Sequence, residues 1–473
     1  MKIIVCVKQL ASGELNPFDA SALELALELG PERVTIVTMG PAKAKALLED
    51  LTRRGATEAV LITGSEFAGA DTLATSRTLA RWLSGQKYDL ILCGRQSVDG
   101  ETAQVGPEIA ELLGLPLVMR TMDIRQCTEQ KIVCDTREER IEVALPALVT
   151  TERSRQLRFP SLWATAGEVQ TVDRRQLELP ADCCGLAGSA TRVIESRENQ
   201  AGRRSCRMIL PSELQGVIDE LLTKTDAEVP EKTTPGELSD SRLATCWITS
   251  EHLRKTAELL AEQVSLVPCE ETAEFCRLAE SEKPEAILFP ADWHSRGIAP
   301  AVAARLGTGL CADCTALVVE EGELHMIRPA QEGNLVARIR CLTKPAMATV
   351  RTEGCSREKV ILSVGKGAAQ HLEEIRSWAE LLGAEVTASR ACVEQGALPY
   401  ESQVGLTGKT VSPKLYIALG ISGAVHHIVG MERAKYVIAV NRDSNAPIFR
   451  YANYGVCCDV TEILKFEKIL GKK

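Results

Sequence analysis

The feature of this sequence that most constrains its fold is an internal repeat of strands and helices. The paired segments are DLILCG (89–94) and EAILFP (285–290), VGPEIAELLGLPL (105–117) and IAPAVAARLGTGL (298–310), and LPALVTT (145–151) and KPAMATV (344–350). Short apolar strands that alternate with amphipathic helices are typical of a parallel sheet with helices on both faces. We therefore predict two related doubly wound α/β domains of the nucleotide-binding type.

The rest of the chain divides into a linker and a third α/β unit. Residues 226–241 are polar, contain two Pro and lack apolar periodicity, which is typical of a linker. A further alternation of strands and helices begins near Lys359, and a hairpin is expected around Ile132 and Ile141. The predicted regions are 1–225, 226–241, 242–354 and 355–473.

Composition excludes several classes of function. Hydrophobic residues make up 45% of the chain and charged residues 25%, a balance typical of soluble globular proteins. The net charge of -9 argues against a nonspecific nucleic-acid binder. No apolar stretch approaches the roughly 18 residues of a membrane span, and the first residues lack a signal-peptide pattern. We expect a cytoplasmic protein.

The 17 cysteines suit a reducing compartment better than a disulfide framework. Cys311 and Cys314 have the two-residue spacing of half a zinc or iron–sulfur site, but a second half-site with that spacing is missing. We expect buried thiols and no metal centre.

Two glycine-containing loops carry the signals for nucleotide binding. LYIALGISGAVHH (415–427) predicts a strand, a turn and a helix whose first backbone N–H groups can hold phosphate oxygens. DGETAQVGP (99–107) follows the strand YDLILCG and opens a helix in the same way. The alternative for the second loop is a helix capped by Thr102, with no ligand.

The combined motifs resemble the electron transfer flavoprotein family. SR at Ser389, QVGLTGK at Gln403, LYIALGISGAVHH at Leu415 and VNRDSNAPIF at Val440 resemble, in order, the FAD-binding domain of the alpha subunit. Gly297 to Arg351 resembles the first domain of that subunit. The first 225 residues resemble the beta subunit, with CVKQ, NPFD and GRQSVDGETAQVGPEIAELLGLP as the matching motifs. The resemblance implies that both subunits are joined in one chain, beta before alpha.

The resemblance also implies roles for residues of a C-terminal FAD site. Arg390 would lie over the flavin and raise its reduction potential, since a fixed cation favours the anionic reduced forms. Thr407 would donate a hydrogen bond near flavin N5, and His427 would meet the N1 and C2 carbonyl edge. The other expected contacts are Ser389, Gln403, Gly405, Gly408, Ser422, Gly423 and Asn441. The chain departs from the family pattern at Lys366, Leu406, His426 and Asn453.

In the beta-like half the resemblance implies a second nucleotide, either a structural AMP or a second FAD. The matching positions are Cys6, Asn16, Asp99, Gly100, Thr102, Ala103, Gln104 and Val105. The form of the loop favours a complete dinucleotide, because Gly100 and Ala103 leave room for the backbone to approach a diphosphate. We expect a second FAD, and AMP stays open.

The segment ERSRQLRFPSLWATAG (152–167) carries Leu157, Phe159, Leu162 and Trp163 between charges. These side chains could pack in a core. The segment also occupies the position of the family's recognition loop, where Leu162 matches the leucine that anchors a partner dehydrogenase.

The function that the resemblance implies is electron transfer between a partner dehydrogenase and a downstream acceptor through FAD, with no catalytic side chain of the protein. An acyl-CoA dehydrogenase is the family's commonest partner, and a 2-hydroxy acid or amine dehydrogenase stays open. One alternative is a bifurcating flavoprotein with FAD in both sites that oxidises NADH and reduces ferredoxin. Another is an adenine-nucleotide-binding protein without redox function.

Overall fold

The computed structural model describes the chain except for residues 199–202, 225–240, 332–334, 352–358, 406–407 and 471–473, and describes residues 466–470 by their backbone alone. The predicted linker therefore lies outside the described residues apart from Ser241. The chain forms two compact units. The first comprises Met1–Ser196, Thr234–Gln331 and Ala337–Arg351, and the second comprises Arg197–Thr233, Glu332–Val336 and Thr352–Lys473.

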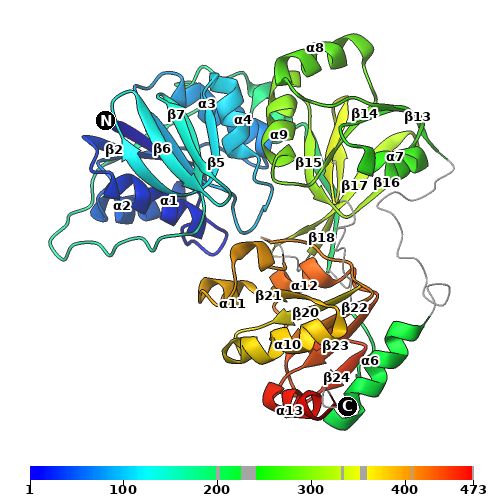
Figure 1. Cartoon of the computed structure of the whole chain (residues 1–473). Coiled ribbons are helices and arrows are strands. Elements are labelled where there is room, and N and C mark those ends of the chain that lie inside the picture. The colour runs from blue at the N-terminus through cyan, green and yellow to red at the C-terminus, as the bar shows by residue number, and fades with distance from the viewer. Residues whose placement is uncertain (199–202, 225–240, 332–334, 352–358, 406–407, 471–473) are drawn as a thin grey trace. The chain divides into compact units, whose positions relative to one another are not determined.

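The first half of the first unit is built on a nine-stranded sheet (Figure 1). Its strands, in spatial order, are β7 (Arg140–Ala144), β6 (Lys131–Thr136), β5 (Leu117–Cys127), β8 (Ala147–Thr151), β4 (Leu90–Gly94), β1 (Lys2–Cys6), β2 (Arg33–Met39), β3 (Glu58–Ile62) and β9 (Val169–Val172). The strands from β5 to β9 pair in parallel, whereas β6 pairs antiparallel with β5 and β7, which confirms the expected hairpin. The helices are α1 (Pro17–Glu28), α2 (Lys45–Arg53), α3 (Thr72–Leu83), α4 (Val105–Leu113) and α5 (Gly185–Gly188).

The second half of the first unit repeats this arrangement in a five-stranded parallel sheet. Its strands, in spatial order, are β13 (Ala261–Leu266), β12 (Leu243–Ile248), β14 (Ala286–Pro290), β19 (Ala346–Val350) and β15 (Leu310–Cys314). The helices are α7 (Arg254–Leu260), α8 (Thr272–Glu282) and α9 (Ser295–Leu306). The order β15-β19-β14-β12-β13 matches β5-β8-β4-β1-β2 of the first half, which confirms the predicted repeat. Gly114 and Gly307 end α4 and α9 with the same left-handed backbone.

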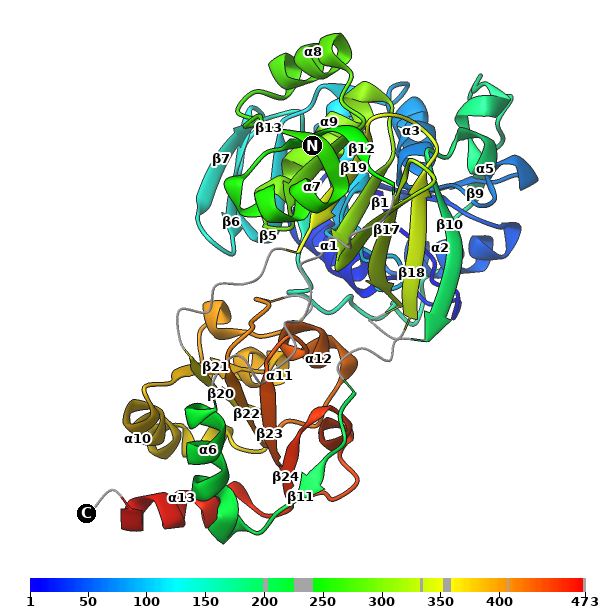
Figure 2. The same cartoon turned by 90° about the vertical axis from the view of Figure 1, so that its right-hand side faces the viewer.

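A four-stranded sheet brings together strands that are far apart in sequence (Figure 2). Its order is β10 (Thr191–Glu198), β18 (Leu335–Cys341), β17 (Glu323–Ala330) and β16 (Ala316–Glu320). Because β10 belongs to the first half and the other three strands follow the β15 segment, this sheet joins the two halves of the first unit.

The second unit has one parallel sheet with helices on both faces, as predicted for the FAD-binding region (Figure 1). Its strands, in spatial order, are β11 (Arg207–Met208), β24 (Tyr454–Val456), β23 (Tyr436–Val440), β22 (Leu415–Leu419), β20 (Val360–Val364) and β21 (Glu385–Ala388). The helices are α6 (Leu214–Thr223), α10 (Leu372–Leu382), α11 (Arg390–Glu394), α12 (Val425–Met431) and α13 (Val460–Leu470).

The core of the second unit has two layers. Leu362 and Ile417 share one apolar cluster with side chains of α6, α10 and α13, among them Trp378. Ile361 and Tyr416 share the other cluster with α12. Because strands buried on both faces have no solvated side, β20 and β22 are apolar at nearly every position. The loops at the carboxyl ends of these strands are the place where doubly wound folds bind ligands.

Candidate functional site

The predicted FAD residues of the second unit gather in loops that follow its parallel strands. Ser389 and Arg390 follow β21, and Gln403 and Gly405 lie on a loop whose Val404 N–H donates to the Ala388 carbonyl at 2.9 Å. Ser422 and Gly423 follow β22, and Asn441 follows β23. The structure thus brings these residues to one edge of the sheet. Thr407 lies outside the described residues.

Glycines allow these loops to pack closely against one another. A Cβ at Gly405, where φ is +141°, would lie 2.6 Å from the His426 carbonyl oxygen, and one at Gly423, where φ is +89°, would lie 2.2 Å from the Ile448 nitrogen. A Cβ at Gly408 would lie 2.2 Å from the Gln403 carbonyl oxygen. Side chains at these positions would force the backbone loops apart.

Asn441 fixes the loop that follows β22. Its Nδ2 donates to the Ile421 carbonyl at 2.9 Å, and the Ile448 N–H donates to the Ser422 carbonyl at 3.1 Å. Gly423 itself is buried, whereas Ser422 and Ala424 on either side are exposed. The loop that carries exposed Ser422 is thus held from two directions.

Asn453, one of the departures from the family pattern, has a structural partner. Its Oδ1 accepts from Arg204 Nη1 at 2.6 Å and from the Val437 N–H at 2.9 Å. Arg204 also donates to the Lys435 carbonyl at 2.8 Å, and burial lowers its pKa to about 10. The Asn453 amide oxygen and the backbone carbonyls of Glu432, Ala434 and Lys435 together hold this guanidinium.

The two charged or titratable side chains of the predicted FAD site differ in burial. The Arg390 guanidinium is about one-third exposed and pairs with Glu394 at 2.7 Å, one helical turn along α11. His427 is buried, and its Nε2 lies 2.9 Å from the Tyr416 hydroxyl. Its Nδ1 makes no hydrogen bond within the described residues, and burial lowers the pKa of His427 to about 4, so the ring is neutral.

These residues fit FAD. The site combines hydroxyls, accessible loop backbone, one partly exposed cation and a buried imidazole nitrogen that lacks a hydrogen bond within the described residues. Phosphate oxygens need N–H and hydroxyl donors, and the reduced flavin needs a cation or N–H donor near its anionic edge. FAD, when bound, supplies the chemistry of accepting two electrons and releasing them singly.

The residues predicted for the second nucleotide surround the carboxyl ends of β1 and β4. Asn16 is buried, with its Nδ2 donating to the Gln96 carbonyl at 2.9 Å and its Oδ1 accepting from the Val98 N–H at 3.3 Å. Cys6 is buried, and burial raises its pKa to about 12, so it stays a thiol. Asn16 therefore shapes the loop that follows β4.

Asp19 completes this region and was not among the predicted site residues. Its carboxylate accepts from the Lys8 N–H at 2.8 Å and from the Gly94 N–H at 3.0 Å, so it ties the loops after β1 and β4 to the start of α1. Burial raises the pKa of Asp19 to about 7. The NPFD motif contained this signal, because its acid stands in the first turn of an apolar helix.

The loop from Asp99 to Gln104 has an unusual backbone. Glu101 and Ala103 adopt the left-handed region, with φ of 55° and 56°. Left-handed residues at every second position turn successive backbone N–H groups toward a common point, which is typical of anion-binding loops. Helix α4 begins at Val105 with Gln104 as its N-cap, so the alternative in which Thr102 caps the helix is wrong.

The second half of the first unit holds this loop in place. Gln104 Nε2 donates to the Leu310 carbonyl at 3.1 Å, and Arg328 Nη2 donates to the Glu101 carbonyl at 3.2 Å. Lys8 forms an ion pair with Asp99 at 2.7 Å. The loop is thus shaped by residues from both halves of the repeat.

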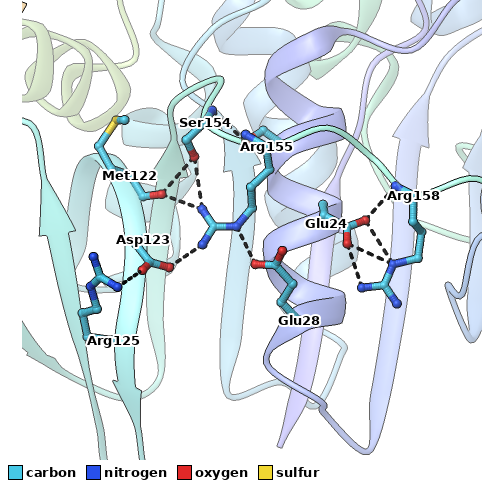
Figure 3. Close-up of polar contacts among 9 residues, drawn as sticks. Glu24, Glu28, Met122, Asp123, Arg125, Ser154, Arg155 and Arg158 are labelled. Atoms are coloured by element: carbon cyan, nitrogen blue, oxygen red, sulfur yellow. Dashed lines mark hydrogen bonds and ion pairs between the residues drawn. The ribbon is translucent and has the colours of Figure 1, made fainter. Parts of the chain in front are cut away.

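The segment expected to contact a partner has a fixed stem and an exposed tip. Figure 3 shows Arg155 between Glu28 and Asp123, and Arg158 against Glu24, whose carboxylate accepts from the Arg158 backbone and guanidinium at 2.8–3.1 Å. Leu157 packs on the core. At the tip, Phe159, Leu162 and Trp163 are 89%, 92% and 90% exposed, so core packing accounts for Leu157 alone.

The described residues lack a metal-binding cluster and a membrane-spanning helix. They contain no group of three or more His, Cys, Asp or Glu side chains that could hold a metal ion, and Cys311 and Cys314 are buried. Within the same ranges, no helix is long and apolar enough to cross a membrane.

Comparisons with known proteins agree with the motifs. The pattern of the electron transfer flavoprotein domain matches residues 3–176 and 270–376, and that of the electron transfer flavoprotein FAD-binding domain matches residues 355–432. Protein FixB of Clostridium saccharobutylicum is 39% identical over 41% of this chain and 72% of its own length. The electron transfer flavoprotein subunit alpha of Thermoanaerobacterium thermosaccharolyticum is 40% identical over 40% of this chain and 71% of its own. Subunit LctC of the lactate dehydrogenase (NAD(+),ferredoxin) of Acetobacterium woodii is 38% identical over 39% and 55%.

Proposed function

The chain belongs to the electron transfer flavoprotein family, and from this premise we propose that it carries electrons from a partner dehydrogenase to a downstream acceptor through FAD bound in its second unit. The observation that carries the proposal is the match to the FAD-binding domain over residues 355–432, which includes Ser389, Gly405 and His427. In this reading Ser422 and the Gly423 backbone hold the nucleotide, and Arg390 and His427 favour its anionic reduced forms.

The experiment for this site replaces Arg390 by Ala. FAD should be retained while the reduction potential of the bound flavin becomes more negative, because the cation that favours negative charge is gone. Arg376→Ala is the matched control, since Arg376 also pairs with a glutamate of its own helix, at 3.2 Å, but lies on α10 outside the site. An unchanged potential in Arg390→Ala contradicts the assigned role.

We also propose that the chain joins the equivalents of both subunits. The electron transfer flavoprotein domain matches two separate stretches, and these fall in the two halves of the repeat. The chain would thus contain in one polypeptide the three regions 1–225, 242–354 and 355–473, with 226–241 as the linker. Size-exclusion chromatography with light scattering should find FAD-loaded particles of this chain without a second kind of subunit.

For the first unit we propose a second FAD. The left-handed residues Glu101 and Ala103 support an anion-binding loop, and buried Asn16 and Gln104 fix it from inside. Reconstitution with excess FAD, extraction and chromatography should give close to two FAD per chain. One FAD and one AMP per chain would contradict the second flavin.

The partner is proposed to dock on the tip defined by Phe159, Leu162 and Trp163. Three large apolar side chains at about 90% exposure lie within five residues of one another, and interfaces concentrate their binding energy in such side chains. An acyl-CoA dehydrogenase is the first partner to test, followed by 2-hydroxy acid and amine dehydrogenases.

A second candidate function is bifurcation, with NADH as donor and ferredoxin as one acceptor. The specific observation is the similarity to LctC, whose name couples NAD(+) and ferredoxin to a dehydrogenase. Anaerobic addition of NADH to the reconstituted chain, without any dehydrogenase, should bleach the flavin if this function holds. If the yellow colour persists after NADH is added, bifurcation is excluded and the protein is a simple electron carrier. If the protein never becomes yellow with FAD, it is an adenine-nucleotide-binding protein without redox function.

A further inference from the structure

A relay of hydrogen bonds between polar side chains leads from helix α3 to the loop before α4 in the first unit. It consists of Ser76 and Thr72 on α3, Glu108 on α4, Gln104 at the end of the loop, and the backbone carbonyl of Leu310 on β15. Ser76, Gln104 and Glu108 are 0%, 2% and 1% exposed. Polar atoms at this depth need partners within the protein, so the direction of each bond can be worked out.

The Leu310 carbonyl fixes the direction at one end of the relay. Gln104 Nε2 donates to it at 3.1 Å, and a carbonyl oxygen can accept but not donate. The amide of Gln104 is therefore oriented with its Oε1 toward the Thr72 hydroxyl, 2.8 Å away. Because this Oε1 is also an acceptor, the single hydrogen of the Thr72 hydroxyl lies between Thr72 and Gln104.

Glu108 then has to supply the hydrogen of the next bond. Its Oε1 lies 3.0 Å from the Thr72 oxygen, whose own hydrogen is already donated to Gln104. An ionised carboxylate would place a second acceptor against a hydroxyl that has one hydrogen. A protonated Oε1 donates to the Thr72 oxygen instead, and Oε2 accepts from the Ser76 hydroxyl at 2.6 Å. Of the two protonation states, the uncharged acid is the one that gives each bond of the relay its hydrogen.

The surroundings of Glu108 favour the same state. In the part of the chain that the structure describes, no arginine or lysine forms an ion pair with it, and burial raises its pKa to about 7. Asp71, at the start of α3, adds to this rise, whereas the neighbouring hydroxyls and Arg77 oppose it. Arg305 of α9, which packs on α4, is paired with Glu111 at 2.6 Å. The positive end of α4 favours a carboxylate by about 1 kcal/mol, less than the several kcal/mol that an unpaired buried charge costs.

We propose that Glu108 is a positioning residue, which as the uncharged acid donates to Thr72 and so holds Gln104 and the loop at residues 99–104 in one orientation for a nucleotide. The role toward a nucleotide rests on the proposed function, whereas the protonated acid is a property of the chain itself. When Glu108 loses its proton, its carboxylate competes with Gln104 for the Thr72 hydrogen. The side chain that ties the loop to Leu310 then loses its second hydrogen bond.

Infrared spectroscopy of the full chain freed of nucleotide tests the proton on Glu108. An uncharged carboxylic acid has a C=O stretching band that a carboxylate lacks, so Glu108→Gln should remove one such band at a pH below about 7. Thr72→Val removes the hydroxyl and should shift that band, because the acid loses its acceptor. Glu111→Gln is the matched control on the same helix, since Glu111 is paired with Arg305 and should contribute no such band.

Binding of FAD in excess of one per chain gives the second readout. In the unsubstituted protein this second affinity should fall as pH rises through about 7, because the relay needs the proton on Glu108. Glu108→Gln should keep the affinity and remove the pH dependence, since its amide N–H can donate to Thr72 at any pH. Thr72→Val should weaken the second FAD about tenfold, the size of one lost hydrogen bond, and leave the first unchanged.

Two results overturn the inference. One is an acid band that Glu108→Gln leaves unchanged, because Glu108 is then ionised in the folded protein. The other is a folded Glu108→Gln protein that loses the second FAD at every pH, because the carboxylate is then required. If the band behaves as expected but even the unsubstituted chain binds one FAD alone, the proposed second flavin fails while the proton on Glu108 stands.

Discussion

The two halves of the first unit place an ion pair at the same point in the fold, with the charges exchanged. In the first half Arg120 lies at a bulge of β5 and Glu152 follows β8, with 3.6 Å between Arg120 Nε and Glu152 Oε1. In the second half Asp313 lies at a bulge of β15 and Arg351 follows β19, with 2.8 Å between Arg351 Nε and Asp313 Oδ1. The acid of one half stands where the other half has its arginine.

The backbone around the two pairs is the same. Arg120 and Asp313 have φ of 59° and 62°. The Arg120 N–H donates to Thr150 Oγ1 at 3.1 Å, and the Asp313 N–H donates to Thr349 Oγ1 at 2.7 Å. The bulge therefore fixes where the two side chains meet but not which of them carries the positive charge, since the attraction is equal in either order.

The surroundings decide whether a buried acid is ionised. Arg95, Arg137 and Arg120 hold the pKa of Glu152 below its usual value, and Arg351 and Arg296 hold that of Asp313 far below. Glu108 is bonded instead to the hydroxyls of Ser76 and Thr72, at 2.6 and 3.0 Å, and burial raises its pKa to about 7. Arginines, rather than hydrogen bonds as such, keep a buried carboxylate charged here.

The largest expected effect on stability comes from breaking the ion pair between Asp313 and Arg351 in the second half. Asp313→Asn removes the carboxylate that pairs with buried Arg351 and with partly exposed Arg296, so the free energy of unfolding should fall by about 3–5 kcal/mol. Urea unfolding measures the loss. Asp50→Asn is the control, because its ion pair with Arg54 is partly exposed and should contribute at most about 1 kcal/mol. Equal effects at the two positions would contradict the buried pair's role.

A double substitution can give the ion pair of the second half the charge order of the first half. Asp313→Arg alone places a third guanidinium beside Arg351 and Arg296, whereas Asp313→Arg with Arg351→Glu reproduces the order of the first half. The double variant should be more stable to urea than the single one by about 2 kcal/mol. A double variant no better than the single one would show that the surroundings accept only one order.

A smaller effect, spread over pH, should come from the buried acids that lack an arginine partner. The pKa of Asp19 is raised from about 3.8 to about 7, so between these values the folded protein holds a proton that the unfolded chain has lost. Stability should therefore fall as pH rises from about 4 to 7, by about 1.4 kcal/mol per pH unit for one such group. Asp19→Asn should flatten this slope in thermal unfolding. Asp313, whose pKa is lowered, loses its contribution only in acid, so Asp313→Asn should leave the slope unchanged.

The exposed tip formed by Phe159, Leu162 and Trp163 follows β8 of the first half, and its proposed docking role can be tested separately from the ion pairs. Leu162→Ala should weaken binding of the cognate dehydrogenase by about 2 kcal/mol, roughly thirtyfold, because it removes an interface anchor. Stability should change by less than about 0.5 kcal/mol. Leu157→Ala is the control, since Leu157 packs on the core and should destabilise the fold instead. Loss of stability in Leu162→Ala would contradict docking.

The smallest effect concerns the loop that the first half uses for its proposed nucleotide. Ala103 is left-handed, with φ of 56°, and glycine adopts this conformation without strain. Ala103→Gly should raise the stability of the nucleotide-free protein by about 1 kcal/mol or less. Ala20→Gly in α1 should lower it by about 1 kcal/mol. A destabilised Ala103→Gly protein would show that the loop is not strained.

The candidate sites were predictable where a motif is continuous in sequence. The loops around Gly405 and Gly423 and the segment Asp99–Val105 lie at the carboxyl ends of strands, as the alternation of strands and helices predicted. Asp19 and Tyr416 were missed, because an acid in an apolar helix and a tyrosine in an apolar strand look like ordinary fold positions. The sequence also allows Thr102 as an N-cap, but the helix begins later, at Val105.

The sequence by itself determined the α/β class, the internal repeat and the family, since these depend on local periodicity and on motifs within single segments. Only the tertiary structure decided which charges meet. Glu152 pairs with Arg95 and Arg137, and Tyr416 on β22 meets His427 on α12. Parallel strands bring their ends together from distant parts of the chain, so the burial and partners that set a proton's position do not follow from neighbours in sequence.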